Sequence, residues 1–372
     1  MATQVSTVAA NAVARTRLKP EIFRLPVERI RAGYYSDAYF TYTKQLLEEQ
    51  RHRPRVTMQI FQKHDSVLGG IDEAIAILRL CSGRDTAGRW VTGWEELDVH
   101  ALHEGERIAP YEVVMTIEGD YTLFAHLETV YLGSLARRSL IMRNVTEVVE
   151  AAHGKQIFYF PARHDHWLVQ TGDGWSAHVA GAIGVSTDAQ ASWWGGRGMG
   201  TVPHGLIAAY GGDTVKAATV FADRFHDEMS ITVLVDWEND SVKTALEVAR
   251  ALGPKLWGVR LDTSEDLVDR SLHNEMGGFR PSGVNRRLVE KVRRALDDAG
   301  YTDVRIVASG GFTAARIREF EAARVPVDAY GVGSSLIRGD NDFTADIVIV
   351  DGRACAKTGR TYRPNARLQK VE

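Results

Sequence analysis

Seven short apolar segments, separated by stretches long enough for a helix, recur through the second half of the chain. They lie at about 157–160, 181–185, 199–202, 231–235, 256–261, 304–308 and 327–332. Asp240, Asn285 and Thr313 stand at the starts of helix-like stretches between them, as N-terminal caps do. Regular alternation of strand and helix predicts a parallel sheet with its helices outside. Seven strands without an obvious eighth predict an irregular seven-stranded α/β barrel; a doubly wound open sheet is the competing architecture.

The first third of the chain has a mixed pattern. Apolar spacing predicts strands at 56–61 and in short pieces across 99–117, and helices at 68–80 and from 121 to about 152. Residues 345–350, the Asp351-Gly352 turn and the segment to Tyr362 predict a hairpin that packs back onto the first domain. We therefore expect a loose N-terminal arm at 1–25, an α/β (α+β) domain built from the N- and C-terminal segments 26–130 and 340–372, and a barrel domain at 131–339.

Composition excludes several classes of protein. The chain has 372 residues, 44% hydrophobic and 25% charged, as in ordinary globular proteins. A formal net charge of -3, without a block of like charge, argues against a nucleic-acid partner. No apolar run reaches the roughly 18 residues that span a membrane, and the first residues lack the apolar centre of a secretory signal. Cys81 and Cys355 are too few for a disulfide framework or a four-ligand zinc site, so we expect a reducing, cytoplasmic environment.

Polar residues gather where the predicted strands end. In chain order these positions hold Arg163, Ser186, His204, Asp236, Arg260 with Asp262, Ser309, and the loop from Gly331 to Ser334. A parallel barrel places its chemistry at the carboxyl ends of its strands. The convergence of arginine, histidine, carboxylate and glycine on these ends predicts an active-site rim rather than ordinary loop polarity.

Two glycine loops follow the last two predicted strands. Ser309-Gly310-Gly311 precedes Thr313 at a helix start, and Gly331-Val332-Gly333-Ser334 lies one strand later. Adjacent glycines let the backbone approach an anion closely, and the amides of a helix start point at it. The pattern predicts a phosphate site over these two strands. The alternative is that the glycines only make tight turns.

Arg260 and Asp262 alternate along a strand, so both side chains point to the same face. There an arginine can bind a phosphate or carboxylate with two hydrogen bonds, while an aspartate accepts from sugar hydroxyls or coordinates a cation. The alternative is an internal ion pair that closes the barrel. Arg163, beside His164 and His166, is a candidate for a second anion; no thiolate or HExxH spacing supports a zinc site there.

His204 and an N-terminal tyrosine cluster each have several possible roles. His204 lies in the segment GTVPHG, residues 200–205, where an exposed imidazole can be a general base, a phosphate donor, a covalent phosphate acceptor or a purely structural group. Tyr34, Tyr35 and Tyr39 surround Ser36-Asp37. Their rings can stack on a flat heterocycle, or fill a core or an interface.

Several separated motifs stand in the order found in a known family. They are SDAYF at 36–40, HEGERIAPYEVVMTIEG at 103–119 followed by HLET, GTVPHGLIAAYGGDTVKAA at 200–218, ITVLVDWENDS at 231–241 and LWGVRLDT at 256–263. With these motifs the chain resembles the nicotinate phosphoribosyltransferases, which belong to the type II phosphoribosyltransferases together with quinolinate and nicotinamide enzymes. The resemblance covers roughly residue 30 to the end of the chain.

The resemblance implies a fold, an assembly and a reaction. The fold is the irregular seven-stranded barrel joined to an α/β domain from both chain ends, in a homodimer or higher homo-oligomer with sites near the subunit contact. The reaction converts nicotinate and phosphoribosyl pyrophosphate (PRPP) to nicotinate mononucleotide and pyrophosphate, for NAD salvage. ATP would be a co-substrate, coupled through a phosphohistidine, and Mg²⁺ would accompany PRPP and ATP.

The resemblance also implies roles for single residues, and it assigns no metal ligand. His204 would be the phosphorylated histidine, and Arg260 and Asp262 would hold the phosphoribosyl group, with Asp262 catalytic. Tyr39 would stack near the pyridine ring, Thr201 would contact substrate, and Arg163 would meet the nicotinate carboxylate or the pyrophosphate. The 5-phosphate would bind at Ser309, Gly310, Gly311, Gly331, Gly333 and Ser334.

Two departures affect substrate choice. Bacterial members commonly have Arg-Arg where this chain has Arg163-His164, and their Asp-Ser-Gly-Asp is here Asp262-Thr263-Ser264-Glu265-Asp266, closer to an archaeal-like Leu-Asp-Thr form. Quinolinate and nicotinamide therefore remain alternative substrates, although quinolinate would need a denser cationic pocket for its two carboxylates. A non-catalytic pyridine-nucleotide binding protein is the alternative of another class. An unrelated phosphate-binding isomerase or aldolase barrel would favour a strand-end lysine, and none is found.

Overall fold

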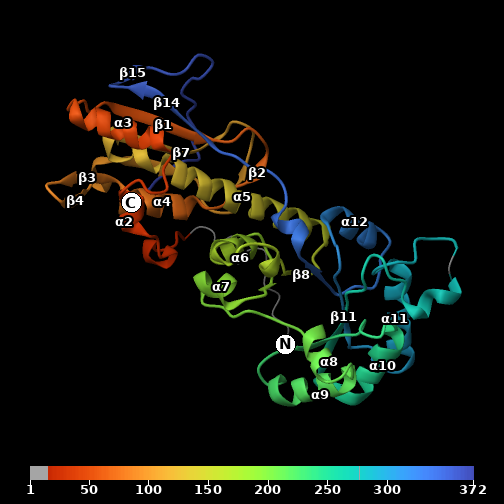
Figure 1. The fold of residues 1–372 in the computed structure, drawn as a ribbon. Coiled ribbons are helices and arrows are strands. Elements are labelled where there is room, and N and C mark those ends of the chain that lie inside the picture. Colours follow the sequence, from red (N-terminus) through yellow and green to blue (C-terminus); the bar gives the residue numbers. More distant parts are fainter. Residues whose placement is uncertain (1–15, 276) are drawn as a thin grey trace. The chain divides into compact units, whose positions relative to one another are not determined.

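The computed structural model describes residues 16–275 and 277–372, which divide into two compact units (Figure 1). The first unit comprises residues up to 143, 175–180 and 339–372, and the second comprises 144–174 and 181–338. Most of the predicted loose arm, residues 1–15, lies outside the described residues. The described part of that arm makes contacts, because Arg17 forms a 2.9 Å ion pair with the buried Asp72.

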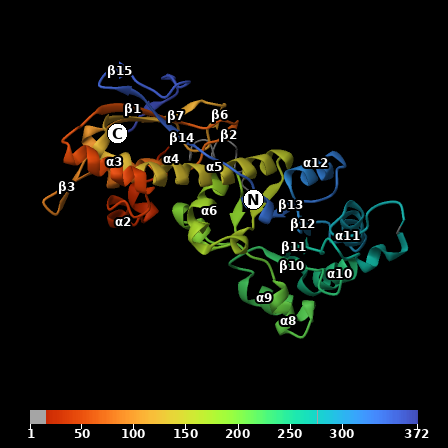
Figure 2. The same ribbon diagram turned by 45° about the horizontal axis from the view of Figure 1, so that its top comes forward.

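The first unit is built on a six-stranded antiparallel sheet of order β15-β14-β1-β7-β5-β16. The strands are β1 (Arg55–Phe61), β5 (Asp98–Ala101), β7 (Val113–Asp120), β14 (Thr344–Val350), β15 (Arg353–Ala354) and β16 (Gln369–Lys370). The predicted strand at 56–61 is confirmed as β1, which lies between β14 and β7 and has every residue after Arg55 buried. The predicted C-terminal hairpin is β14 and β15, and in Figures 1 and 2 these blue strands lie beside the orange-red β1.

Helices and smaller strands complete the first unit. They are α2 (Val27–Arg31), α3 (Ala38–Glu49), α4 (Ile71–Cys81) and the start of α5 (Glu128–Ala151), with the pairs β2 (Ser66–Val67) with β6 (Arg107–Ile108) and β3 (Gly83–Thr86) with β4 (Arg89–Thr92). The predicted helices at 68–80 and 121–152 are confirmed as α4 and α5, with later starts. Ile71, Ile75 and Leu78 of α4 are buried in the same core as Ile60 of β1, so the apolar helix face covers the sheet.

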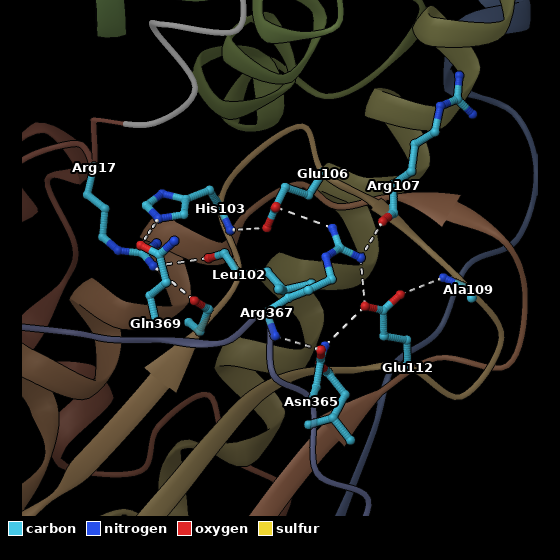
Figure 3. Close-up of polar contacts among 12 residues, drawn as sticks. Arg17, Leu102, His103, Glu106, Arg107, Ala109, Glu112, Asn365, Arg367 and Gln369 are labelled. Atoms are coloured by element: carbon cyan, nitrogen blue, oxygen red, sulfur yellow. Dashed lines mark hydrogen bonds and ion pairs between the residues drawn. The ribbon is translucent and has the colours of Figure 1, made fainter.

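Polar contacts hold the last residues of the chain onto the first unit (Figure 3). Arg367 forms ion pairs with Glu112 at 2.6 Å and Glu106 at 3.2 Å. Gln369 and the ring of His103 are 3.1 Å apart, and β16 adds to the sheet beside β5. The described C-terminal segment therefore belongs to the same folded unit as the strands of the first third of the chain.

The second unit contains a six-stranded sheet in which all strands are parallel, as predicted. Its order is β10-β11-β12-β13-β8-β9, with β8 (Gln156–Tyr159), β9 (Gly184–Val185), β10 (Ile231–Leu234), β11 (Leu256–Leu261), β12 (Arg305–Ala308) and β13 (Ala329–Val332). The first strand, β8, pairs with the last, β13, which is the order of a sheet curled on itself. A doubly wound sheet would instead start in the middle and grow outwards in both directions.

The predicted strand at 199–202 is not a strand. Val202 makes one isolated parallel bridge with Val233, and the Met199 amide donates to the Val185 carbonyl at 2.7 Å. Gly198 and Gly200 weaken strand formation, and Pro203 lacks the amide that would continue a ladder. A regular seven-stranded barrel is therefore not confirmed, and the described part of this unit has six strands and this bridging segment.

Predicted caps begin three of the helices outside the sheet. The helices of the second unit are α7 (Asp188–Ala191), α8 (His204–Ala209), α9 (Thr214–Phe225), α10 (Ser241–Leu252), α11 (Arg286–Asp298) and α12 (Ala314–Ala322), and α6 (Gln170–Val179) is divided between the two units. The side chains of Asp240, Asn285 and Thr313 accept from backbone amides at the starts of α10, α11 and α12. Within residues 16–275 and 277–372, no helix is both long and apolar enough to cross a membrane.

Candidate active site

Arg260, Asp262 and Ser309 form a hydrogen-bonded group at the carboxyl ends of β11 and β12. The Arg260 Nε donates to the Ser309 Oγ at 2.7 Å, and the Ser309 Oγ donates to the Asp262 Oδ1 at 2.7 Å. The Arg260 Nη2 lies 3.3 Å from the Asp262 Oδ2. The predicted convergence of these strand ends is thus found, and the ion pair considered for Arg260 and Asp262 is present as part of the same group.

Phe160 supports the Arg260 guanidinium. The guanidinium carbon lies 5.1 Å from the centre of the Phe160 ring, a cation–π distance. Phe160 directly follows β8, and its amide donates to the Val332 carbonyl at 2.8 Å. A Cβ at Gly331 would lie 2.8 Å from the Phe160 ring and 3.3 Å from the Ser309 Cβ. Gly331 therefore gives the room that lets these two side chains reach Arg260.

His204 pairs with Asp236 across the ends of two chain segments. Its Nε2 lies 3.0 Å from the Asp236 Oδ1, and the Asp236 side chain is only 8% exposed whereas His204 is 42% exposed. This hydrogen bond raises the pKa of His204; partial burial opposes it, and the charges of Asp236 and Asp262 add to the rise. Because Nε2 is engaged by Asp236, Nδ1 is the ring nitrogen that remains for a substrate.

The two glycine loops differ in why they need glycine. Gly310 and Gly311 have φ of +84° and +71°, a left-handed conformation that side chains other than glycine rarely adopt. Gly333 instead allows close approach, because a Cβ there would lie 3.1 Å from the His164 ring. Ser334 begins a short 3₁₀ turn, Ser334–Ile337. Tight turning and anion binding are compatible at Gly310 and Gly311.

Thr201 lines a cavity of about 190 Å³ in the second unit. Its walls include Phe158, Phe160, Met199, Trp257 and Val307. Three of these side chains, those of Phe158, Phe160 and Val307, point inward from the curled sheet in the same alternating pattern as Arg260 and Ser309. The cavity is thus mainly apolar and shares the Phe160 ring with the arginine group.

Arg163 and Tyr39 are both exposed and lie in different units. Arg163 is in a 3₁₀ turn, Ala162–His164, in the second unit, and makes no ion pair within the described parts of the chain. Tyr39 is on α3 in the first unit, 61% exposed, with its hydroxyl 3.4 Å from an Asp37 carboxylate oxygen. Tyr39 does not fill the core of its own unit, which leaves the stacking and interface roles.

Sequence reasoning missed Phe160 and left Asp236 without a specific role. Asp236 was placed at a strand end, and only the folded chain brings its carboxylate to His204. Phe160 looks like an ordinary apolar residue; its position two residues after Phe158 on an inward-facing alternation is the signal that could have found it. No group of three or more metal-ligating side chains occurs in the residues that the structure describes.

Comparisons with known proteins connect this geometry to a family. Residues 37–139 match the family model described as quinolinate phosphoribosyl transferase, N-terminal domain. A nicotinate phosphoribosyltransferase of Mycobacterium tuberculosis is 28% identical over 296 residues, which cover 76% of this chain and 59% of the relative. A nicotinate phosphoribosyltransferase of Bacillus subtilis is 24% identical over 64% of this chain and 45% of the relative. The chain thus spans about half the length of the curated relatives that it matches.

Solved structures agree on the fold. Nicotinate-nucleotide pyrophosphorylase from Pyrococcus furiosus is 32% identical with a TM-score of 0.76, covering 93% of this chain and 85% of that one. Human nicotinic acid phosphoribosyltransferase has a TM-score of 0.63 at 16% identity, with 88% and 77% coverage, and shows a common fold alone. This fold is that of the type II phosphoribosyltransferases. The chain belongs to this family, and its curated relatives are named nicotinate phosphoribosyltransferases.

Proposed function

We propose that this protein transfers a phosphoribosyl group from PRPP to nicotinate, giving nicotinate mononucleotide and pyrophosphate for NAD salvage in the cytoplasm. The observation that carries the proposal is the group of Arg260, Asp262 and Ser309 beside Phe160, at the carboxyl ends of parallel strands. The family relationship supports the same reaction class.

The transfer needs positive charge at one side of the ribose and a positioned nucleophile at the other. The nicotinate ring nitrogen donates its lone pair to C1 of the ribose while the bond from C1 to pyrophosphate breaks, so positive charge develops on the sugar. Arg260 stabilises the negative charge that gathers on the departing pyrophosphate. Asp262 accepts hydrogen bonds from ribose hydroxyls and stabilises the electron-poor sugar. No strong base is required.

The remaining groups bind the ends of the two substrates. Arg163 supplies a cation for the nicotinate carboxylate or the pyrophosphate. The backbone of residues 310–311 and of the loop 331–334, with Gly310, Gly311, Gly333 and Ser334, binds the 5-phosphate.

ATP coupling is assigned to His204. The Nδ1 lone pair attacks the γ-phosphorus of ATP, the bond to ADP breaks, and water later hydrolyses the phosphohistidine. Asp236 keeps the Nε2 proton in place, which orients Nδ1 and stabilises the ring once it is phosphorylated.

Mg²⁺ is proposed to bind together with the diphosphate of PRPP. Asp262 offers carboxylate oxygens, the hard ligands that Mg²⁺ prefers, and Mg²⁺ in phosphoryl sites is commonly held by one or two carboxylates plus substrate oxygens. That arrangement fits a chain whose described residues hold no cluster of three ligands. The ion would supply charge neutralisation of the pyrophosphate.

Quinolinate is the second candidate substrate, and the names of two matching proteins or families support it. The matching family model is named for quinolinate, and the Pyrococcus furiosus structure is named a nicotinate-nucleotide pyrophosphorylase. Quinolinate carries two neighbouring carboxylates, and Arg163 with Arg260 offers few cations for both. Nicotinate therefore fits the site better.

The proposal is tested by supplying PRPP and Mg²⁺ with nicotinate, nicotinamide or quinolinate, each with and without ATP. ATP-stimulated nicotinate mononucleotide is the expected result. Turnover of another pyridine alone would change the substrate, and no turnover with any of them would favour a non-catalytic pyridine-nucleotide binding protein. In the same assay, His204→Ala should abolish ATP stimulation and keep some ATP-independent transfer; indifference to this change would remove the phosphohistidine role.

A further inference from the structure

Ser309 has no free donor with which to bind a phosphate. Its side chain is buried, with 2% exposed, and its amide donates to the Leu261 carbonyl at 2.9 Å. Its hydroxyl accepts from the Arg260 Nε and carries one proton to give. That proton has two acceptors in reach, the Leu261 carbonyl at 3.0 Å and the Asp262 Oδ1 at 2.7 Å. The contact to the Asp262 carboxylate is the shorter of the two, and its acceptor is charged. The hydroxyl therefore donates its proton to Asp262.

The Ser309 hydroxyl, rather than the direct ion pair, sets how Arg260 and Asp262 face each other. Both bonds to the hydroxyl are 2.7 Å, whereas the direct contact between Arg260 and Asp262 is 3.3 Å. Phe160 holds the guanidinium from its face while Ser309 holds it at Nε. Neither of these contacts uses Nη1, which makes no hydrogen bond within the described residues and so remains for a ligand.

We propose that Ser309 is a positioning residue: its hydroxyl links Arg260 and Asp262 and fixes both side chains in the orientation that meets the ribose and diphosphate of PRPP. This role rests on the proposed function for its catalytic consequence. It separates Ser309 from Gly310 and Gly311, whose backbone is assigned to the 5-phosphate. A long arginine side chain held in one rotamer before the substrate arrives loses less freedom on binding, so the link should favour PRPP affinity.

The first test observes Arg260 directly in the ligand-free protein. The Nε–Hε resonance of Arg260 is identified by its disappearance in Arg260→Lys, and its exchange with solvent is measured in the wild type and in Ser309→Ala. We expect at least about tenfold faster exchange in Ser309→Ala, because the Nε–H loses its buried acceptor. Unchanged exchange would overturn the proposal.

A matched control is Ser241→Ala. Ser241 is a buried serine of the same unit whose hydroxyl donates to a carboxylate, Asp269, at 2.7 Å, away from Arg260. The Ser241→Ala variant loses an equivalent hydrogen bond and should leave the exchange of the Arg260 Nε–H and the PRPP kinetics unchanged. If Ser309→Ala does not fold, Ser309→Cys keeps the volume with a weak donor and should give an intermediate exchange rate. Equal changes in the Ser241 and Ser309 variants would show a general loss of rigidity and reject the positioning role.

The second test is kinetic. Ser309→Ala should lower kcat/KM for PRPP by about 10- to 100-fold and leave KM for nicotinate within about twofold. Equal changes in both KM values would contradict a specific effect on Arg260 and Asp262. The wild type could transfer phosphoribosyl to no pyridine while Ser309→Ala still speeds the exchange of the Arg260 Nε–H with solvent. In that case the proposed function fails and the positioning of Arg260 by Ser309 stands.

Discussion

At the scale of single residues, one hydroxyl and one aromatic ring hold the charged pair of the candidate site: Ser309 bonds both Arg260 and Asp262, and Phe160 lies against the guanidinium. Arg260 and Asp262 were expected on one face because they alternate along a strand, and they are found together. The hydroxyl of Ser309 between them, and the Phe160 ring against the guanidinium, depend on the spacing of neighbouring strands. Such contacts join residues far apart in the chain, so no local pattern encodes them.

Asp262→Ala should separate function from stability. The carboxylate is 20% exposed and accepts from Ser309 and Arg260, so its loss leaves a partly solvated arginine rather than a buried unpaired charge. We expect a fall in phosphoribosyl transfer of about 100-fold or more, with a change in unfolding free energy of about 1 kcal/mol. Initial rates and urea unfolding measure the two effects. Equal loss of folding would instead support a purely structural ion pair.

Asp236→Asn should move the pH dependence of ATP stimulation. The hydrogen bond to Asp236 raises the pKa of His204, so the pair stabilises the fold below the ordinary pKa near 6.5 and loses this effect as pH rises through the raised value. A phosphoryl acceptor must be neutral, so ATP stimulation should increase as pH rises through the pKa of His204. Without the carboxylate that rise should occur at lower pH. Measuring ATP stimulation from pH 5 to 9 in the wild type and in Asp236→Asn tests this shift. Identical profiles would show that Asp236 does not set the pKa of the phosphoryl acceptor.

At the scale of elements, local signals were reliable where a side chain acts on its own backbone. Asp240, Asn285 and Thr313 cap helices as predicted, because a cap needs only an oxygen within three residues of the first amides. The segment 199–202 was predicted wrongly, since apolar content does not reveal whether a neighbouring strand offers a continuous ladder. Strand pairing is set by the whole sheet and not by the segment.

The start of α4 should make stability depend on pH. Glu104 is buried and accepts from the amides of Gly70 and Asp72, and burial with the nearby charge of Asp72 raises its pKa to about 8. A raised pKa means that the folded state holds the proton more tightly, so stability is greatest below the ordinary value of 4.5 and falls as pH rises to about 8.

Glu104→Gln removes this titration and should flatten that part of the stability curve, with Glu95→Gln, at an exposed position of the same unit, as the control. Urea unfolding at several pH values between 4 and 9 measures it. A slope that survives in Glu104→Gln would assign the dependence to another group.

At the scale of the whole molecule, an exposed aromatic surface on and before α3 suggests an assembly. The tyrosine surface comprises Tyr34, Tyr35, Tyr39, Tyr42 and Leu46, each between 42% and 70% exposed. Helix α3 buries none of its residues within its own chain. Aromatic side chains so placed are typical of protein interfaces. We expect a homodimer that uses this surface, in keeping with the assembly that the family implies.

Light scattering after size exclusion tests the assembly. The wild type should have the mass of a dimer, and Tyr42→Glu with Leu46→Glu should shift it towards a monomer while the circular dichroism spectrum is kept. A control pair of charges on another exposed helix, Val220→Glu with Arg224→Glu on α9, should leave the mass unchanged. A monomeric wild type would reject the interface.

The sheet of the first unit has a consequence for the order of synthesis. Strand β1 needs β14 on one side, and β14 emerges from the ribosome almost 300 residues after it. All six strands of the parallel sheet, by contrast, lie within one uninterrupted stretch between β7 and β14. During translation the inserted unit can therefore complete its own sheet while β1 still presents an unpaired, hydrophobic edge to the surrounding water. Nascent chains stalled before residue 344 should consequently depend on chaperones to a degree that the finished protein does not.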